Sequence, residues 1–294
     1  MGIDYSPNKA ELLLKQTQFI TKMLEKFDQG NAHAVRNPLI VGQDLTPSDD
    51  HPILKSCTVY RELIGSLLYI ANATRPDISY AMSPREMHWR AALRVIHYLK
   101  GTSTHGIIYK KSSANAIRLR AYCDANWGGD KQSRRSTSGV LVMLGGGVVV
   151  YKCKRQNSVA LSSAEAEYMS LALATQEIMW LRYLLKEMGM ATDQATTINL
   201  DNKSAISIAT NQGYTPRAKH IDLHAHFVRD HVEQGNIKLH HVPSAEQLAD
   251  YLTKALHLNY FTYVRRAAFV NVQVDGECHE LHRSLVCLKS IYQH

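Results

Sequence analysis

The stretch that most constrains the fold runs from Ile117 to Cys123 and has an acidic residue, Asp124, directly behind it. Apolar side chains alternate with Arg118, Arg120 and Tyr122, which is the period of a half-buried β-strand. A carboxylate at the end of a strand is usually a turn former or a solvated group. The functional interpretation is that Asp124 belongs to a set of acids around metal ions, and the rest of the chain must decide between the two.

The residues around this strand predict a sheet flanked by helices. Short, β-branched-rich strands are predicted at 106–111, 139–144, 148–153, 196–200 and 237–242. A long helix is predicted to begin at Ser162 or Ser163 and to stop at Gly189, and further helices are predicted at 204–210, 221–233 and 245–256. Three glycines at 145–147 predict a hairpin between two of the strands.

The first hundred residues have a different texture. Apolar residues at helical spacing predict helices at 8–27, 60–72 and 88–100, and Arg75-Pro76-Asp77 predicts another helix start. Residues 29–56 are rich in Gly, Pro, Asn, Asp and Ser, which predicts an irregular connector. The chain therefore divides by pattern into a mostly helical first part and a mixed α/β second part.

Four acids occupy related positions in the second part. Asp124 and Asp201 each follow a predicted strand, Glu167 lies one or two turns into the long helix, and Asp250 lies near the start of the last predicted helix. Carboxylates gathered at one edge of a sheet repel each other unless a cation joins them. Oxygen-only ligand sets suit Mg²⁺ or Mn²⁺. The competing interpretation of each acid is a helix cap or a surface ion pair.

Composition narrows the class of partner and the compartment. The net charge of +8 and the pI near 9.2 favour a polyanion such as nucleic acid as partner, although a merely basic protein is about equally consistent with them. Five cysteines without close pairing predict a reducing compartment. Neither a signal peptide nor a membrane-spanning run is recognisable, so we expect a cytoplasmic or nuclear location and no membrane partner.

Several longer motifs are more specific than spacing. The segments AYCDANWGGD, STSGV, ALSSAEAEYMSLALATQE, INLDNKSAI, KHIDLHAHFVRD and VPSAEQLADYLTKAL follow one another in this order. Together they resemble the ribonuclease H region of copia-type retrotransposon polyproteins. VYRELIGSLLYIANATRPDISYAMS and HWRAALRVIHYLKGT resemble the segment that joins reverse transcriptase to ribonuclease H in that family. The resemblance covers the chain from about residue 8 to residue 256.

This resemblance implies a ribonuclease H-like fold, with a mixed five-stranded sheet flanked by helices, preceded by a mostly helical connection segment. It implies hydrolysis of the RNA strand of RNA–DNA hybrids by a two-metal mechanism with Mg²⁺, or Mn²⁺, as cofactor. The catalytic and metal-binding acids carried over are Asp124, Glu167, Asp201 and Asp250. Within AEAEY the choice is Glu167, because AEYMSL resembles the AELxAL helix of related ribonucleases H, and Glu165 becomes a helix-start charge.

The same resemblance predicts the division of the chain and its partners. Residues 1–104 correspond to a reverse transcriptase thumb and connection remnant, 105–256 to the ribonuclease H-like domain, and 257–294 to a tail that resembles nothing known. The partners implied are an RNA–DNA hybrid and other parts of the polyprotein. Substrate contacts are predicted at Arg134, Arg135, Lys219 and His220, for which a solvated loop or helix surface is at least as good an interpretation.

Two departures leave alternatives open. No YxDD motif of a polymerase palm occurs, and AMSPREMHW is shorter than the family pattern. Both favour a catalytically inactive nucleic-acid-binding remnant of a truncated element. A third hypothesis is a related metal nuclease that acts on DNA, such as an integrase. Integrases share the ribonuclease H-like fold but usually use three acids. The AEAEY, LDNKSA and QLAD contexts argue against it.

Overall fold

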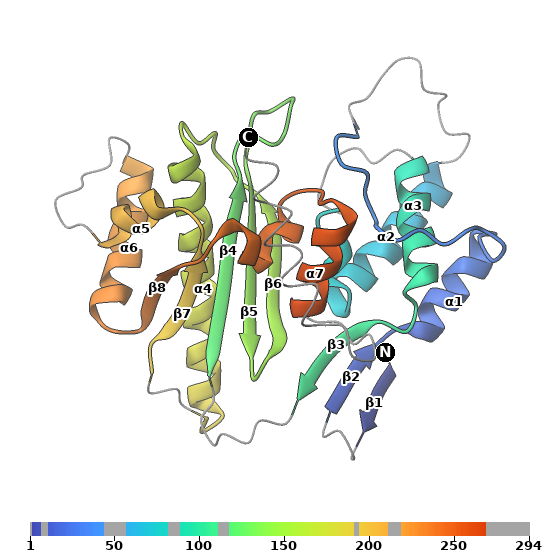
Figure 1. Cartoon of the computed structure of the whole chain (residues 1–294), viewed down its shortest axis with the longest axis horizontal. Coiled ribbons are helices and arrows are strands. Elements are labelled where there is room, and N and C mark those ends of the chain that lie inside the picture. Colours follow the sequence, from blue (N-terminus) through green and yellow to red (C-terminus); the bar gives the residue numbers. More distant parts are fainter. Residues whose placement is uncertain are drawn as a thin grey trace.

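The computed structural model describes residues 2–6, 11–43, 57–81, 89–110, 118–190, 194–210 and 219–268. In these ranges the strands form two sheets. One has five strands in the order β6-β5-β4-β7-β8, and the other has three in the order β1-β2-β3. Figure 1 shows the five-stranded sheet in the middle of the molecule, with helices on both of its sides.

The five-stranded sheet is mixed. It consists of β4 (Leu119–Asn126), β5 (Thr137–Leu144), β6 (Gly147–Arg155), β7 (Thr196–Leu200) and β8 (Ile237–His241). β6, β5 and β4 are antiparallel neighbours, whereas β4, β7 and β8 are parallel. The predicted hairpin is confirmed, since Gly145 and Gly146 adopt φ of 58° and 87°, a region that glycine enters without steric cost. This is the ribonuclease H-like sheet expected from the sequence.

One face of this sheet is covered by α4 (Ser163–Glu187), α5 (Lys203–Thr210) and α6 (Lys219–Glu233). Ala121, Val140 and Val142 of the strands pack against apolar residues of α4, including Tyr168 and Leu171. The start of α4 is capped as predicted, because the Ser162 hydroxyl accepts a hydrogen bond from the Glu165 amide. These contacts hold α4 at a fixed position across the sheet.

The other face is covered by elements from both ends of the chain. They are α1 (Thr17–Lys26), α2 (Cys57–Ala73), the 3₁₀ turn η2 (Pro76–Ile78), α3 (Trp89–Gly101) and α7 (Leu258–Ala268). Leu141, Met143 and Val148 of the sheet belong to the same apolar core as these helices. Figure 1 shows α7 between the sheet and the N-terminal helices. The predicted helices at 60–72 and 88–100 are confirmed as α2 and α3.

The helix predicted over residues 8–27 is wrong in its first half. Residues Glu11–Lys15 form strand β2, which pairs with β1 (Gly2–Ser6) and with β3 (Gly106–Lys110), and only Thr17–Lys26 is helical. Leu12 fits the helical spacing of the residues that follow it, but pairing with Tyr109 far along the chain determines its conformation. β3 therefore lies outside the five-stranded sheet.

The helix predicted over Ala245–Leu256 is also wrong. Two 3₁₀ turns, η3 (Ser244–Glu246) and η4 (Leu248–Leu252), take its place. Gln247 between them is extended, and its side chain donates to the carbonyl of Cys123 and accepts from the amide of Ala249. These bonds tie the segment to β4, so a regular helix is interrupted. Beyond it lies α7, where no structure was assigned from the sequence.

The domain boundaries predicted at 104/105 and 256/257 stay predictions. None of the helices in the described ranges combines the length and the apolar character that a membrane crossing requires.

Candidate active site

Two strand ends and one helix bring three acids together. β4 and β7 are parallel neighbours, so Asp124 on β4 and Asp201 directly after β7 lie at the same edge of the sheet. Glu167 reaches this edge from α4, and the nearby Ser170 hydroxyl donates to the carbonyls of Asp124 and Gly139, at 2.8 and 3.2 Å. Asp124, Glu167 and Asp201 each offer a carboxylate oxygen, and these oxygens lie within 4.8 Å of one another.

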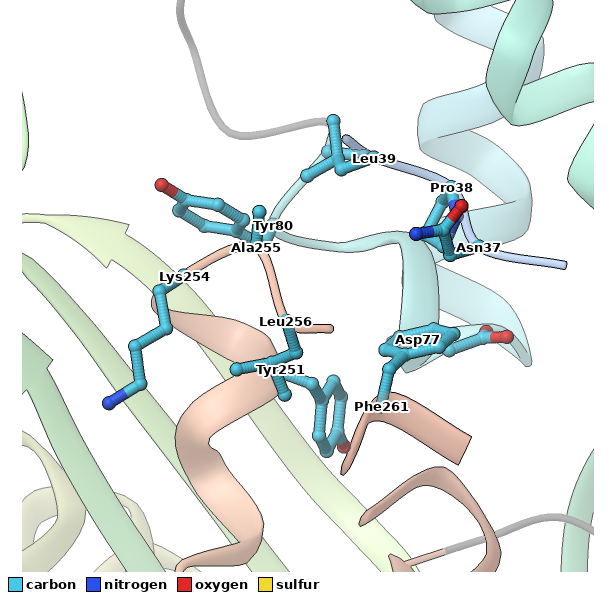
Figure 2. A pocket seen from close by; sticks show the side chains of 11 residues that line it. Asn37, Pro38, Leu39, Asp77, Tyr80, Tyr251, Lys254, Ala255, Leu256 and Phe261 are labelled. Carbon is cyan, nitrogen blue, oxygen red and sulfur yellow. The ribbon is translucent and has the colours of Figure 1, made fainter. Parts of the chain in front are cut away.

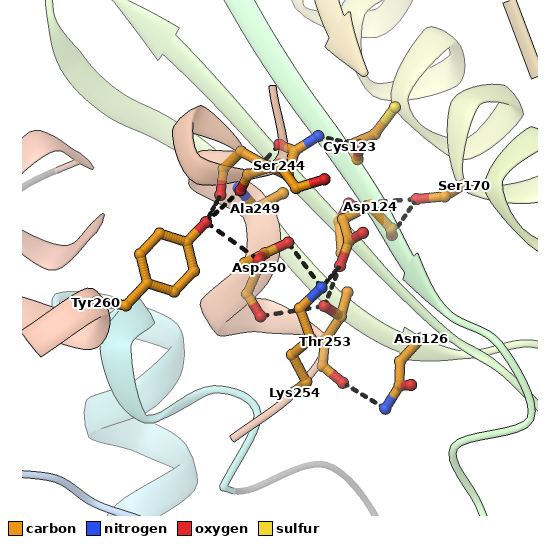
Figure 3. A network of polar contacts seen from close by, with 12 residues as sticks. Cys123, Asp124, Asn126, Ser170, Ser244, Ala249, Asp250, Thr253, Lys254 and Tyr260 are labelled. Carbon is orange, nitrogen blue, oxygen red and sulfur yellow. Dashed lines mark hydrogen bonds and ion pairs between the residues drawn. The ribbon is translucent and has the colours of Figure 1, made fainter. Parts of the chain in front are cut away.

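Asp250, the fourth acid, approaches from η4. Beside it, the Thr253 hydroxyl donates to the Asp124 carboxylate, and Asn126 donates to the Thr253 carbonyl at 3.2 Å. The Lys254 ammonium lies 2.9 Å from Asp250 Oδ1 and 3.5 Å from Asp124 Oδ2. Figure 3 shows this ammonium between the two carboxylates. Asp250 therefore faces Asp124 across a lysine, rather than belonging to the set of three.

The electrostatics of the site are unfavourable for anions without a cation. Burial raises the pKa of the Glu167 carboxyl to about 9, with the charges of Asp124 and Asp201 adding to the effect. Burial and Asp124 raise the pKa of Asp250 to about 7. Glu167 Oε2 is buried without a hydrogen-bond partner. A buried carboxylate oxygen without a partner, facing two other acids, fits a divalent cation as its ligand.

This arrangement predicts a dependence of stability on pH in EDTA. Asp250 keeps its proton in the folded state up to about pH 7, whereas an unfolded aspartate loses it near pH 4. Its contribution is therefore present at low pH and is lost as the pH rises through about 7. The free energy of unfolding of Asp250→Asn, relative to wild type, should rise between about pH 4 and 7 and then level off. Chemical denaturation at several pH values measures this difference, and a constant or falling difference would contradict the prediction.

The two predicted arginines lie in the loop between β4 and β5. Asp130 organises this loop, since its Oδ1 accepts from the amides of Gln132 and Ser133, both at 3.0 Å. Arg134 is exposed and Arg135 is half-buried. The loop follows Asp124 by a few residues, so both side chains belong to the rim of the acidic edge. A half-exposed indole on this rim, Trp127, is held by a 2.9 Å hydrogen bond from its Nε1 to the carbonyl of Ala160.

A groove of about 330 Å³ opens beside the end of β6. Lys154, Arg155 and Gln156 line it together with side chains of α4. In the strand register, Asp124 faces Gly139, and Gly139 faces Cys153. Neighbouring strands are about 5 Å apart, so the groove begins about 10 Å from Asp124. The basic residues of the groove, Lys154 and Arg155, therefore lie at the same edge of the sheet as Asp124.

The other predicted substrate contacts are placed only in part. Lys219 and His220 begin α6, but their side chains lie outside the described residues. The sequence reasoning missed Thr253, Lys254 and Tyr260, whose hydroxyl donates to Asp250 Oδ2 at 3.1 Å. The spacing of Lys254 four residues after Asp250 was the available signal for one of them.

A recess adjoins this site on the side of the N-terminal helices. Leu39, Tyr80, Tyr251 and Phe261 line it, and the stem of Lys254 forms part of its wall. In Figure 2 the Lys254 side chain extends away from these residues. Asn37 and Asp77 add polar groups to its lining, and the Asp77 carboxylate is paired with Arg75.

A mixed five-stranded sheet of this strand order, with acids converging at the ends of β4 and β7, defines a ribonuclease H-like domain with a candidate metal site. No family model matches the chain. It is 38% identical over 286 residues to the retrovirus-related Pol polyprotein from transposon RE2 of Arabidopsis thaliana, which covers 95% of this chain and 19% of that protein. It is 37% identical to the corresponding polyprotein from transposon RE1 of the same plant, over 89% of this chain and 18% of that protein.

The chain belongs to the family of copia-type retrotransposon Pol polyproteins, and it spans about a fifth of the length of the curated relatives it matches. Among solved structures it is similar to LC11-RNase H1, isolated from compost by a metagenomic approach. That similarity has 16% identity and a TM-score of 0.36, and it covers 46% of this chain and 92% of that one.

Proposed function

We propose that this chain hydrolyses the RNA strand of RNA–DNA hybrids, with Mg²⁺ or Mn²⁺ as cofactor. The observation that carries the proposal is the convergence of Asp124, Glu167 and Asp201, whose oxygens lie within 4.8 Å of one another at the edge of a ribonuclease H-like sheet. Membership of the Pol polyprotein family supports it, and the preference for the RNA strand follows from the resemblance to that family's ribonuclease H region.

The residues of the site have separate roles in this proposal. Asp124, Glu167 and Asp201 would hold one divalent cation, and Asp124 with Asp250 a second. When bound, such cations stabilise the negative charge that develops on a phosphodiester and lower the pKa of a bound water. Ser170, Thr253 and Gln247 fix the backbone and carboxylate of Asp124 and the approach of η4, so the acids stay in place while the substrate binds.

The rim of the site supports a nucleic-acid substrate. Arg134 and Arg135 on one loop, and Lys154 along the groove, can meet backbone phosphates on the two sides of the acids, while Arg155 of the groove pairs with Asp130 at 3.1 Å. The fixed, half-exposed ring of Trp127 offers a surface on which a base or sugar can pack. Lys219 and His220 remain candidates from the sequence. Other parts of a Pol polyprotein are proposed partners, and a cytoplasmic or nuclear location stays a prediction.

One experiment separates the candidate functions. Purified protein is incubated with end-labelled RNA–DNA hybrid, RNA duplex and DNA duplex, each with Mg²⁺, with Mn²⁺ and with EDTA. The proposal expects cleavage of the hybrid's RNA strand alone, and only with a divalent cation. Cleavage of DNA alone would indicate a different metal nuclease. Hybrid binding without any cleavage would indicate an inactive remnant.

The arginines of the rim can be tested through salt dependence. If Arg134 and Arg135 contact phosphates, replacing both with alanine should reduce the slope of log affinity against log salt by about 1.4–1.8 units, since each phosphate contact contributes about 0.7–0.9. Fluorescence anisotropy with a labelled hybrid in EDTA measures the slope. Lys152→Ala serves as control, because this lysine pairs with Glu177 at 3.4 Å. A slope unchanged in the double variant would reject the contact.

A further inference from the structure

Lys254 places a positive charge between two carboxylates of the candidate site. Its ammonium lies 2.9 Å from Asp250 Oδ1 and 3.5 Å from Asp124 Oδ2, and these two carboxylates are almost completely buried. Figure 3 shows Nζ pointing into the space between them. A single positive charge therefore joins two acids that belong to different elements, β4 and η4.

The carboxylates have further partners that fix their orientation. The Thr253 hydroxyl donates to the same Asp124 oxygen that Lys254 approaches, and Tyr260 donates to the second oxygen of Asp250 at 3.1 Å. Asp124 also belongs to the set with Glu167 and Asp201. Asp124 is thus shared between two neighbouring cation positions, and the ammonium fills the one that faces Asp250.

The lysine side chain is more exposed than the two carboxylates that it joins. Its side chain is 39% exposed, although Asp124 and Asp250 are not. A lysine has a flexible four-carbon stem and carries its charge at the tip. By contrast, Thr253 beside it has a buried side chain that is bonded to the Asp250 carbonyl and to Asp124. A partly exposed, flexible cation at Lys254 therefore follows directly on a buried residue, Thr253, that holds Asp124 in place.

We infer that Lys254 is a built-in counter-ion: it neutralises Asp124 and Asp250 while no divalent cation lies between them, and it competes with a divalent cation for that position. The inference rests on the proposed function, because it needs a cation site at these acids. Lys254 thereby acts as a positioning residue that keeps Asp250 near Asp124 before cations bind. Its withdrawal accompanies the binding of the cation between them.

The first test counts bound Mn²⁺ in the absence of substrate, by electron paramagnetic resonance of the free ion. Wild type should bind one Mn²⁺ well and a second one weakly. In Lys254→Met the second ion should bind about tenfold more tightly, because the competing charge is gone. Adding Asp250→Asn to Lys254→Met should remove this gain. Lys152→Met, which loses an ordinary Lys–Glu pair, should leave Mn²⁺ binding unchanged.

The second test is thermal melting. In EDTA, Lys254→Met should melt below wild type, since two buried carboxylates lose their counter-ion, and Lys254→Arg should restore the wild-type midpoint. Saturating Mn²⁺ should remove the deficit of Lys254→Met, because bound cations stabilise the folded state. An equal deficit with and without Mn²⁺ would mean that the lysine acts only through packing, and would overturn the inference.

The outcomes distinguish the inference from the proposed function. If wild type binds Mn²⁺ and Lys254→Met binds the second ion no more tightly, the counter-ion role is refuted and the metal site stands. If wild type and variant both bind no Mn²⁺, the proposed function fails together with the inference. If Lys254→Met binds the second Mn²⁺ more tightly than wild type, and melts below wild type only in EDTA, both the inference and the proposed metal site are supported.

Discussion

Replacing Glu167 with glutamine should lower the rate of hybrid cleavage by more than about a hundredfold, since even substitutions in the outer shell of a metal site typically cost 10–100-fold. The same change should raise the melting temperature in EDTA. The wild-type carboxyl is buried between Asp124 and Asp201, and its pKa is raised to about 9. Near pH 7 the folded state must therefore hold a proton that the unfolded state releases, and glutamine removes this penalty.

The measurements are single-turnover cleavage with Mg²⁺ and melting curves in EDTA at pH 7. The melting temperature in EDTA should rise by about 2–4 °C for each 1 kcal/mol of penalty that glutamine removes. Glu165→Gln is the matched control, because Glu165 lies two residues away on α4 and accepts a 2.8 Å hydrogen bond from the amide of Leu161. It should keep nearly full activity. Full activity in Glu167→Gln, or a lower midpoint in EDTA, would show that Glu167 has a structural role instead.

Replacing Asp77 with alanine should cost about 3–5 kcal/mol of folding free energy, the range for breaking a buried ion pair. Arg75 donates to both oxygens of Asp77, at 2.9 and 2.8 Å, and both side chains are fully buried. Although burial alone would raise the pKa of Asp77, the Arg75 guanidinium lowers it below its usual range. In the alanine variant the Arg75 guanidinium keeps its hydrogen bonds to Thr102 but loses the buried anion that balances its charge.

This pair also connects the two ends of the described chain. Tyr98 donates to Asp77, and Arg265 of α7 donates to the Tyr98 hydroxyl at 3.0 Å. Urea unfolding of Asp77→Ala measures the loss. Glu62→Gln is the control, because Glu62 pairs with Lys26 on the surface, where such pairs contribute about 0–1 kcal/mol. A loss for Asp77→Ala as small as that of the control would show that the buried pair contributes little.

The sequence by itself determined the elements whose signals are local. Alternation before Asp124 predicted β4, the glycines at 145–147 predicted the hairpin, and Ser162 with Glu165 predicted the start of α4. In such segments the residues that set the conformation are neighbours along the chain, so spacing and capping suffice. The positions of Asp124, Glu167 and Asp201 followed from the same signals and from the family motifs.

Only the tertiary structure decided the features that depend on distant partners. Leu12 lies in a strand rather than a helix because it pairs with Tyr109. The segment around Asp250 forms 3₁₀ turns because Gln247 is bonded to Cys123 of β4. Lys254 lies between Asp124 and Asp250 because these bonds bring η4 against the strand end. Propensity and periodicity contain no term for contacts between residues about a hundred positions or more apart, so the sequence pattern could not determine them.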